Sequence, residues 1–381
     1  MALLITLAAV LLAVTALPYV CYLVLYAIVA PSGSPAAKES IEPTVSVVLP
    51  TYNESGIVER KLENLQTVDY PAEKMELVVV DSSDDETPAL VREYAETHDE
   101  FPALTIIEEE ERRGLAPALN DAYEAAEGEI VVKTDCDSML DERTVREAIA
   151  NFADEDVDAV TGQNVEIPGG SDVESSYRGV QSHIQSLESH LDSTLIFHGP
   201  FSAFRNESIV ALDPNSLADD TELALKIRRS GGRVIFDPAA HYKEAAHSSF
   251  RKRRTQKDRR AMGLIRLLVQ HRDALFRYGR YGRIVLPFNW WFMIASPWLL
   301  LASVLAVTAA AVSVAGIAGA SVLVPLLAFV WLGQADRLGP IQPVYAIFDT
   351  QVSLLRASVE LVRGESDGTW EVDAELREAY E

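Results

Sequence analysis

Residues 128–140 read GEIVVKTDCDSML, and this stretch indicates both the fold and the place of its site. The apolar run 130–132 predicts a short buried strand that ends in polar residues. Asp135 and Asp137 follow two positions apart, so extended backbone would point both carboxylates to the same side. Ligands of open α/β sheets bind just beyond the carboxyl ends of the strands. The pair therefore favours a site for Mg²⁺ or Mn²⁺, which prefer oxygen ligands, although a solvated acidic loop also explains it.

Three earlier apolar runs, residues 45–49, 77–80 and 104–107, predict further strands. Helical patterns lie between the strands, at about residues 56–65, 88–97 and 115–126. Strands that alternate with helices predict a parallel sheet with helices on both faces. Polar residues gather after the first, second and fourth strands, which would bring them to one edge of the sheet.

The composition describes an acidic soluble part joined to very apolar segments. The chain has 381 residues, a formal net charge of −24 and 48% hydrophobic residues, a length that allows about two to three structural units. The acidity argues against nucleic-acid binding, which needs a basic surface, and it would suit a high-salt cytoplasm, as in a halophile. The two cysteines, Cys21 and Cys136, give no sign of a disulfide framework.

Two uncharged segments are long enough to cross a membrane, which takes about 20 residues. Residues 1–37 carry no charge and lack the basic start of a signal peptide, so they predict a transmembrane helix at 1–30 and a linker at 31–43. No charge occurs between Arg283 and Asp336, which predicts two more spans within 284–335, with a break near 313–320. The basic segment 266–283 precedes them, and the positive-inside rule then places the main domain, 44–265, in the cytoplasm of a multi-pass membrane protein.

Two segments near the membrane carry charge. Residues 340–363 place Asp349, Arg356 and Glu360 among apolar residues, which predicts an amphipathic helix at the membrane interface, followed by an acidic tail at 364–381. Residues 251–260 are strongly basic and could rest on anionic headgroups.

Six segments then occur in a characteristic order: VVLPTYNES, VVVDSSDDET, RRGLAPALNDAYEAAEGEIVVKTDCD, HGPFSAFRNE, DDTELALKIRRSGG and QKDRRAMG. Together they resemble the successive motifs of the membrane-bound family 2 glycosyltransferases, which include cellulose, hyaluronan and poly-N-acetylglucosamine synthases. The resemblance covers roughly residues 44–265. It implies a GT-A fold, an α/β architecture with a doubly wound mixed sheet, flanked here by transmembrane helices.

The resemblance also implies an activity: transfer of a hexosyl or N-acetylhexosaminyl group, with inversion, from a nucleotide-diphosphate donor to an acceptor hydroxyl. Glycolipid, lipid-linked or surface polysaccharide synthesis at the cytoplasmic membrane face would be the setting. The implied partners are a nucleotide sugar, a lipid-linked or saccharide acceptor and the membrane, and the implied cofactor is Mg²⁺ or Mn²⁺.

Site residues follow from the same motifs. Asp135 and Asp137 would bind the metal, Asp137 more directly and Asp135 nearer the donor sugar. Gln256 and Arg259 match a Gln-x-x-Arg-Trp motif in which the arginine approaches the diphosphate. The remaining expected donor-binding residues are Thr51, Asn53, Glu54, Asp81, Asp85 and Arg113.

The acceptor side would lie in residues 197–205 and in the pair Asp219 and Asp220, with Asp220 as the general base. Acidic residues at a helix start also stabilise the helix dipole, which is the alternative interpretation. Arg260 stands where processive synthases carry the acceptor-stacking tryptophan, so a single-transfer enzyme is favoured over a processive synthase. An inactive nucleotide-sugar-binding scaffold and a membrane transport or assembly component remain as other classes.

Overall fold

The computed structural model describes residues 2–98, 100–166, 172–244 and 250–364, and its main domain is built on one mixed sheet. The strands are β1 (Val45–Thr51), β2 (Met75–Asp81), β3 (Ala103–Glu108), β4 (Ile130–Lys133), β5 (Ser138–Leu140), β6 (Val157–Glu166), β7 (Ser202–Arg205) and β8 (Arg233–Glu244). They follow the order β3-β2-β1-β4-β7-β6-β8-β5. The first four are parallel to one another, whereas β7 is antiparallel to both β4 and β6.

The four strands predicted from apolar runs are confirmed as β1 to β4. Strands β5 to β8 were not predicted, although β8 contains a three-residue apolar run at 234–236. Three-residue β5 and four-residue β7 are too short to show a period, and β8 interrupts its apolar residues with Asp237 and Pro238. Their pairing is set by distant neighbours: β7 lies between β4 and β6, and β5 closes the far edge against β8.

Helices cover both faces of the sheet, as predicted for alternating strands and helices. Leu62 of α2 (Val58–Gln66), Val91 of α3 (Thr87–Thr97) and Ile149 of α5 (Thr144–Ile149) are buried in one apolar cluster. Leu119 of α4 (Leu115–Ala125) and Leu223 of α7 (Asp219–Ser230) are buried in a second cluster. The strand side chains divide between the two clusters because successive residues of a strand point to opposite faces.

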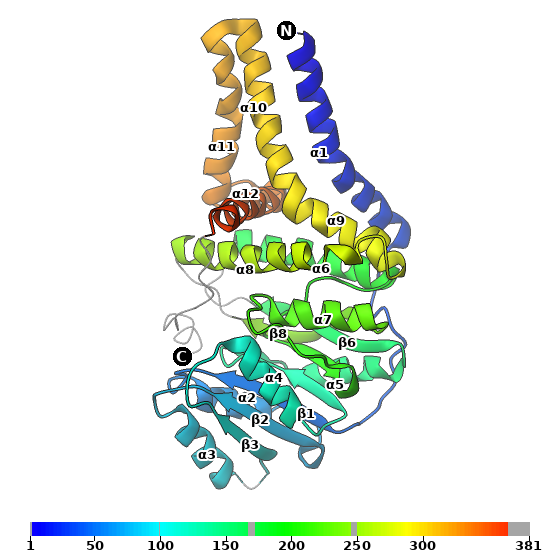
Figure 1. Ribbon diagram of the computed structural model, residues 1–381, viewed down its shortest axis with the longest axis vertical. Helices are drawn as coiled ribbons and strands as arrows, with labels where there is room; N and C mark the ends of the chain where they lie inside the picture. The colour runs from blue at the N-terminus through cyan, green and yellow to red at the C-terminus, as the bar shows by residue number, and fades with distance from the viewer. Residues whose placement is uncertain (1, 99, 167–171, 245–249, 365–381) are drawn as a thin grey trace.

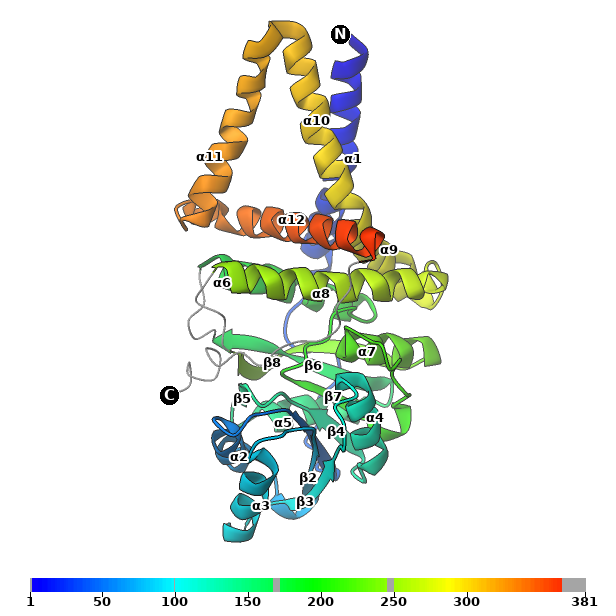
Figure 2. The ribbon, with the colours of Figure 1, turned by 60° about the vertical axis from the view of Figure 1, so that its left-hand side comes forward.

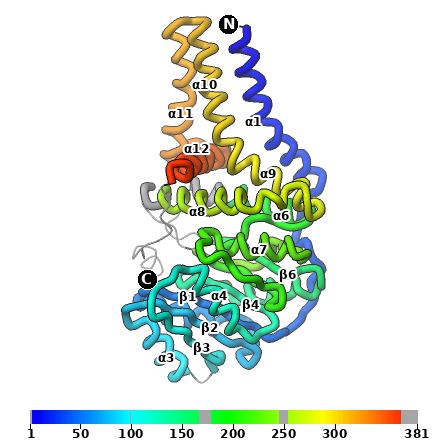
Figure 3. The backbone as a smooth tube through the Cα atoms, viewed as in Figure 1, coloured from blue at the N-terminus to red at the C-terminus, as the bar shows by residue number. Residues whose placement is uncertain are grey.

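Three helices lie crosswise between this domain and a group of upright apolar helices (Figure 1). The crosswise helices are α6 (Asp172–Leu191), α8 (Phe250–Gln270) and α12 (Gln342–Arg363). The upright ones are α1 (Ala2–Val29), α10 (Ser296–Ala315) and α11 (Leu323–Gln334), and short helical segments, including η5 (Tyr281–Val285) and α9 (Leu286–Trp290), lead into α10. Figure 2 shows α12 directly above α8, and the tube of Figure 3 shows α10 and α11 as the two arms of one hairpin.

Two helical stretches are long and apolar enough to cross a membrane, Ala2–Val29 and Tyr281–Gln334. Only 11% and 17% of the residues in their most apolar windows are buried inside the protein, as expected of helices that face lipid. Hydroxyl groups join them: Thr15 Oγ1 lies 3.3 Å from Ser303 Oγ, and Tyr19 Oη lies 3.2 Å from Ser296 Oγ. Hydroxyl contacts of this kind are typical between helices in lipid. The two stretches therefore suggest association with a membrane.

Charged side chains join α8 to α12. Asp349 of α12 is 6% exposed and forms ion pairs with Arg254 and Lys257 of α8, the second at 3.3 Å. Arg356 of α12 forms a further ion pair, at 3.0 Å, with Asp258 of α8. Two of the charges that predicted an interfacial helix thus face another helix of the protein. The sequence pattern could not distinguish a headgroup partner from a protein partner.

The first prediction concerns this joint. Replacing Asp349 with asparagine should leave Arg254 and Lys257 without their common carboxylate in a mostly buried position. Breaking a buried pair in this way costs about 3 kcal/mol. Amide hydrogen exchange in α8 and α12 should accelerate accordingly, while Glu360→Gln on the same helix should change little. Unchanged exchange in the Asp349→Asn variant would show that the pairs do not hold the two helices together.

Candidate active site

The centre of the candidate site is the side chain of Lys133, the last residue of β4, which is 1% exposed. Its ammonium lies 2.7 Å from Asp135 Oδ1, 2.9 Å from the carbonyl oxygen of Gly199 and 3.4 Å from Asp220 Oδ2. One buried cation therefore connects the Asp-x-Asp loop, the loop before β7 and the start of α7.

Local backbone structure explains how these groups come together. Antiparallel pairing of β4 with β7 sets Lys133 opposite Ser202, which brings the preceding turn over the end of β4. Gly199 lies in that turn, and a Cβ there would be 2.9 Å from Asp220 Oδ2 and 3.0 Å from both Asp135 Oδ2 and Lys133 Nζ. A side chain at position 199 would displace these three charged groups, so glycine suits the close approach.

Burial and charge act in opposite directions at this centre. Burial lowers the pKa of Lys133, but the surrounding carboxylates outweigh it and raise that pKa well above its usual value. Burial raises the pKa of both Asp219 and Asp220, and Lys133 lowers it. Asp220 Oδ1 and Asp219 Oδ2 are buried and accept no hydrogen bond from any described residue. A buried oxygen of this kind carries an unmet demand for a donor, which an incoming hydroxyl could supply.

Expected nucleotide-binding residues meet where β1 and β2 end. Thr51 and Asp81 are register partners, and Thr51 Oγ1 donates to Asp81 Oδ2 at 2.5 Å. Asp81 is 2% exposed and also accepts from the backbone N–H and hydroxyl of Ser83, at 3.0 and 2.8 Å. Asn53, with a positive φ of 53°, donates its N–H to the same hydroxyl. This network gives the two loops a fixed shape.

The adjoining residues Glu54 and Asp85 belong to the same network. The N–H of Glu54 donates to Thr87 Oγ1 at 2.9 Å, and Glu54 is 4% exposed. Asp85 accepts from the N–H of Thr87 at 2.9 Å and from the N–H of Ser55 at 3.3 Å. Burial acts to raise the pKa of Asp85, but these hydrogen bonds outweigh it and lower the pKa. The structure thus brings five of the six expected nucleoside-side residues together.

Arg113, the sixth, is held elsewhere. Its guanidinium donates to Glu109 at 2.6 Å and pairs with Asp121, and its side chain is half exposed. The preceding Arg112 instead lies over the ring of Tyr52 in the β1 loop, 3.7 Å from the ring centre. Sequence alone does not distinguish two adjacent arginines, because the difference depends on which acidic neighbours the fold supplies.

Helix α8 brings the expected Gln-x-x-Arg pair to the other side of the site. Arg259 is half-buried, and burial together with Arg260 lowers its pKa whereas Asp219 raises it, so its guanidinium lies within electrostatic reach of the start of α7. Gln256 is also half-buried and precedes Arg259 by three positions, which places both on one face of the helix.

Arg260, at the position of the expected tryptophan, is fixed by an ion pair. It lies 2.7 Å from Glu244 at the end of β8, and Arg178 of α6 lies 2.8 Å from the same carboxylate. Burial acts to raise the pKa of Glu244, but the two arginines outweigh it and lower the pKa to about 2. Nearby, His198 is held by Gln185 at 3.1 Å, and burial lowers its pKa to about 3. Charged and polar side chains thus occupy the region where a processive synthase would carry a tryptophan that stacks on the acceptor sugar.

Comparison with known proteins identifies the family. The model "Glycosyl transferase family 2" matches residues 46–212, and the model "Glycosyl transferase family group 2" matches residues 130–333. A solved structure, the mannosyltransferase PcManGT from Pyrobaculum calidifontis in complex with GDP-Man and Mn²⁺, is 31% identical. That match covers 94% of this chain and 100% of PcManGT, with a TM-score of 0.76. The chain belongs to glycosyl transferase family 2. The expected GT-A fold is also confirmed.

Curated relatives of this family 2 glycosyltransferase agree over a shorter range. Glycosyltransferase AglD of Haloferax volcanii is 32% identical over 215 residues, which cover 54% of this chain and 34% of AglD. The poly-beta-1,6-N-acetyl-D-glucosamine synthase of Staphylococcus aureus is 27% identical over 206 residues, which cover 51% of this chain and 48% of the synthase. The chain thus spans a third to a half of the length of these relatives.

Asp135 and Asp137 fit a divalent cation that shares its ligands with a substrate. The Asp135 side chain is 30% exposed, and its contact with Lys133 is made by Oδ1. Within the described residues, no cluster of three or more His, Cys, Asp or Glu side chains could hold a metal alone. Mg²⁺ and Mn²⁺ suit such an incomplete set, because diphosphate oxygens and water complete their coordination.

Lys61 of α2 supports the loop that carries Asp135 and Asp137, and the motifs did not predict this role. Its fully buried ammonium donates to Thr134 Oγ1 at 2.8 Å and to the carbonyl oxygen of Ser138 at 2.6 Å. These two residues flank Asp135 and Asp137 on either side. Burial lowers the pKa of Lys61 to about 8 even though the loop carboxylates oppose it. One signal was available: Lys61 falls on the apolar stripe of its helix, where a lysine needs buried partners.

The second prediction tests this role of Lys61. Lys61→Met should leave the Ser138 carbonyl without its donor and loosen the loop, weakening Mn²⁺ binding in the presence of a nucleoside diphosphate by about 10–100-fold, as is usual for residues that support metal ligands. Calorimetry and Mn²⁺ paramagnetic resonance measure this directly. Lys74→Met, which removes an exposed lysine from the same domain, is the matched control. Equal Mn²⁺ affinity in the Lys61→Met variant and the parent would remove Lys61 from the site.

Proposed function

We propose that this protein transfers a sugar, with inversion, from a nucleotide-diphosphate donor to an acceptor hydroxyl, with Asp220 as the general base. The observation that carries the proposal is the state of the Asp220 carboxylate. Its Oδ2 faces Lys133 at 3.4 Å, and its buried Oδ1 accepts no hydrogen bond from a described residue. The same lysine holds Asp135, so the base lies beside the expected donor–metal site.

The chemistry requires such a base because a sugar hydroxyl is a poor nucleophile near neutral pH. In the proposed step the hydroxyl proton moves to Asp220 Oδ1 while the oxygen attacks the anomeric carbon opposite the leaving nucleotide, and a single displacement of this kind inverts that carbon. A positioned carboxylate contributes on the order of 10²–10⁴ in rate. Burial raises the pKa of Asp220 and so makes its carboxylate a stronger base. The positive charge of Lys133 stabilises that carboxylate before it takes the proton.

On the donor side, Asp135 and Asp137 would hold Mg²⁺ or Mn²⁺, which when bound neutralises charge on the departing diphosphate. Gln256 and Arg259 would approach the same diphosphate. The network around Asp81 would hold the nucleoside, with Arg112 in the place first expected for Arg113. PcManGT was solved with GDP-Man and Mn²⁺ at 31% identity over its full length, which supports GDP-mannose as the first donor to test.

We further propose a multi-pass membrane protein with about three spans, α1, α10 and α11, and a cytoplasmic catalytic domain. The apolar stretches and the arginines before η5 support this arrangement. A lipid-linked or saccharide acceptor would then reach the site from the membrane side, beneath α6 and α8. Processive polysaccharide synthesis is the second candidate, supported by the likeness to the poly-N-acetylglucosamine synthase. The ion pair of Arg260 with Glu244, where a stacking tryptophan was expected, favours single transfer.

The third prediction is the direct test of the proposal. Purified full-length protein should release nucleotide from one member of a nucleotide-sugar panel, GDP-mannose first, in a reaction that needs Mn²⁺ or Mg²⁺ and an acceptor. Asp220→Asn, which is nearly isosteric but cannot take the proton, should keep the fold and the donor affinity and lose about 10²-fold or more in turnover. Asp219→Asn should lose less. Near-parental turnover in the Asp220→Asn variant would assign the base to another residue.

The fourth prediction concerns pH. Asp220 works as a base only when deprotonated, and its pKa is raised, so turnover should fall as the pH drops through that raised value. The charge of Asp219 is one cause of the raised pKa. Asp219→Asn should therefore lower the pKa of Asp220 and move the acid limb of the rate profile to lower pH. Asp69→Asn, an exposed position, is the control. An acid limb that stays in place or moves to higher pH in the Asp219→Asn variant contradicts the coupling.

A further inference from the structure

The turn between α8 and α9, residues 271–283, carries exposed cationic charge that no described carboxylate neutralises. Arg272, Arg277, Arg280 and Arg283 are all exposed, and none forms a salt bridge with another described residue. The chain as a whole has a net charge of −24, so acidic partners are abundant elsewhere. We call residues 271–283 the arginine turn.

The contrast with the basic stretch of α8 is informative. That stretch, residues 251–260, was the sequence candidate for contact with lipid headgroups. The side chains of Arg254, Lys257 and Arg260 within it instead pair with carboxylates of α12 and β8. Exposed arginines without a described carboxylate partner gather instead in the arginine turn.

The arginine turn has a fixed shape that exposes an aromatic ring. Phe276 and Tyr278 have positive φ values of 64° and 59°, which are uncommon for residues other than glycine. The N–H of Phe276 donates to the carbonyl of Gly282 at 2.7 Å, and Arg228 donates to the carbonyl of Tyr278 at 3.2 Å. A Cβ at Gly282 would lie 1.5 Å from the carbonyl oxygen of Arg277, so only glycine closes this turn. The Phe276 side chain remains 70% exposed.

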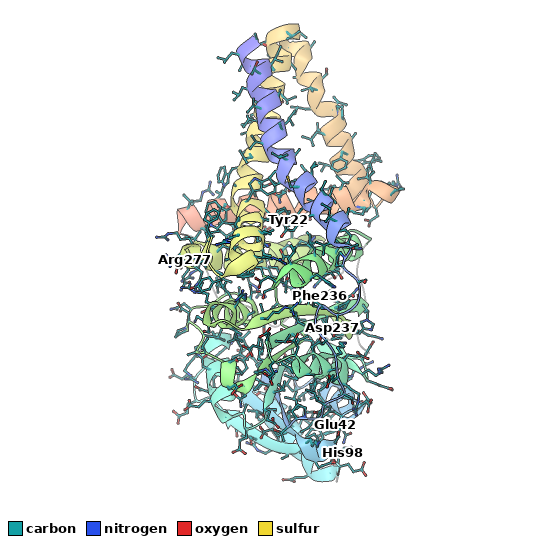
Figure 4. All side chains as sticks on the ribbon, turned by 90° about the vertical axis from the view of Figure 1, so that its right-hand side faces the viewer. Tyr22, Glu42, His98, Phe236, Asp237 and Arg277 are labelled. Carbon is teal, nitrogen blue, oxygen red and sulfur yellow. The ribbon has the colours of Figure 1, made fainter. Side chains whose placement is uncertain are left out.

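The position of the turn indicates its partner. It leads directly into Tyr281–Gln334, the longer of the two apolar stretches. Figure 4 shows Arg277 at the outer edge of the molecule, at a level between Tyr22 of the apolar α1 and Phe236 of the sheet. Cationic side chains beside a membrane-crossing segment meet headgroup phosphates, and an exposed aromatic ring suits the boundary between headgroups and acyl chains.

We propose that the arginine turn is a docking surface for anionic phospholipid headgroups. The guanidinium groups of Arg277 and Arg280 would bind headgroup phosphates, and Phe276 would enter the acyl boundary beside them. An acidic protein partner would match the arginines but would leave unexplained why the turn adjoins a membrane-crossing stretch. The inference does not depend on the sugar donor or on the general base.

The test is lipid binding by the purified full-length chain in a neutral detergent. Fluorescent phosphatidylglycerol should bind more tightly than fluorescent phosphatidylcholine, and the difference should shrink at high salt. Arg277→Gln combined with Arg280→Gln should weaken phosphatidylglycerol binding by about tenfold or more. Phe276→Ser should also weaken it. The control variant removes two exposed arginines of the main domain, Arg92→Gln with Arg143→Gln, and should bind as the parent does.

Three outcomes would overturn the proposal. Equal affinity of the parent for the two lipids would exclude recognition of an anionic headgroup. Parental affinity in the double variant, Arg277→Gln with Arg280→Gln, would place the lipid elsewhere once circular dichroism has confirmed its fold. Full competition by soluble glycerol phosphate, together with parental lipid binding in the Phe276→Ser variant, would show a site for free phosphate.

Discussion

The buried ammonium of Lys133 is the contact on which the arrangement of the site depends. An unpaired buried charge is strongly unfavourable, so the fold has to surround this lysine with acceptors. It does so with Asp135 from the adjoining loop, the carbonyl of Gly199 and Asp220 from the start of α7. These groups lie up to 87 positions apart in sequence. The insertion of β7 beside β4 and the absence of a side chain at Gly199 both serve that convergence.

The distance in sequence between contacting groups also explains what could be predicted from the sequence. Continuous apolar runs predicted β1 to β4, and motif resemblance predicted the helix start at Asp219 and Asp220 and the fold family. Short or polar strands such as β5 and β7 form only because distant strands pair with them, so no local pattern indicates them. Lys133 was missed because a lysine is expected at the surface unless its buried partners are known. Lys61 was missed although its place on the apolar stripe of α2 was a signal.

Helix α8 links the site to the apolar helices. One part of it carries Arg259 toward the start of α7, Arg260 reaches the end of β8, and Arg254 with Lys257 reaches α12. The residues proposed for the donor side and those that contact α12 thus lie on one helix. Three described residues of the basic segment, Arg254, Lys257 and Arg260, form internal ion pairs. The exposed arginines of the arginine turn beyond it form no salt bridge with another described residue.

The central claim is that Lys133 connects two parts of one active site: Asp135 and Asp137, which would hold the metal and the donor, and Asp220, which would be the general base. A structure of the full chain with Mn²⁺, an unreactive analogue of its nucleotide sugar and an acceptor tests it most directly. The account predicts the metal and diphosphate at Asp135 and Asp137, the acceptor hydroxyl against Asp220 Oδ1, and Lys133 still between the two carboxylates. An acceptor hydroxyl bound against a different carboxylate, or a metal held away from both aspartates, would contradict it.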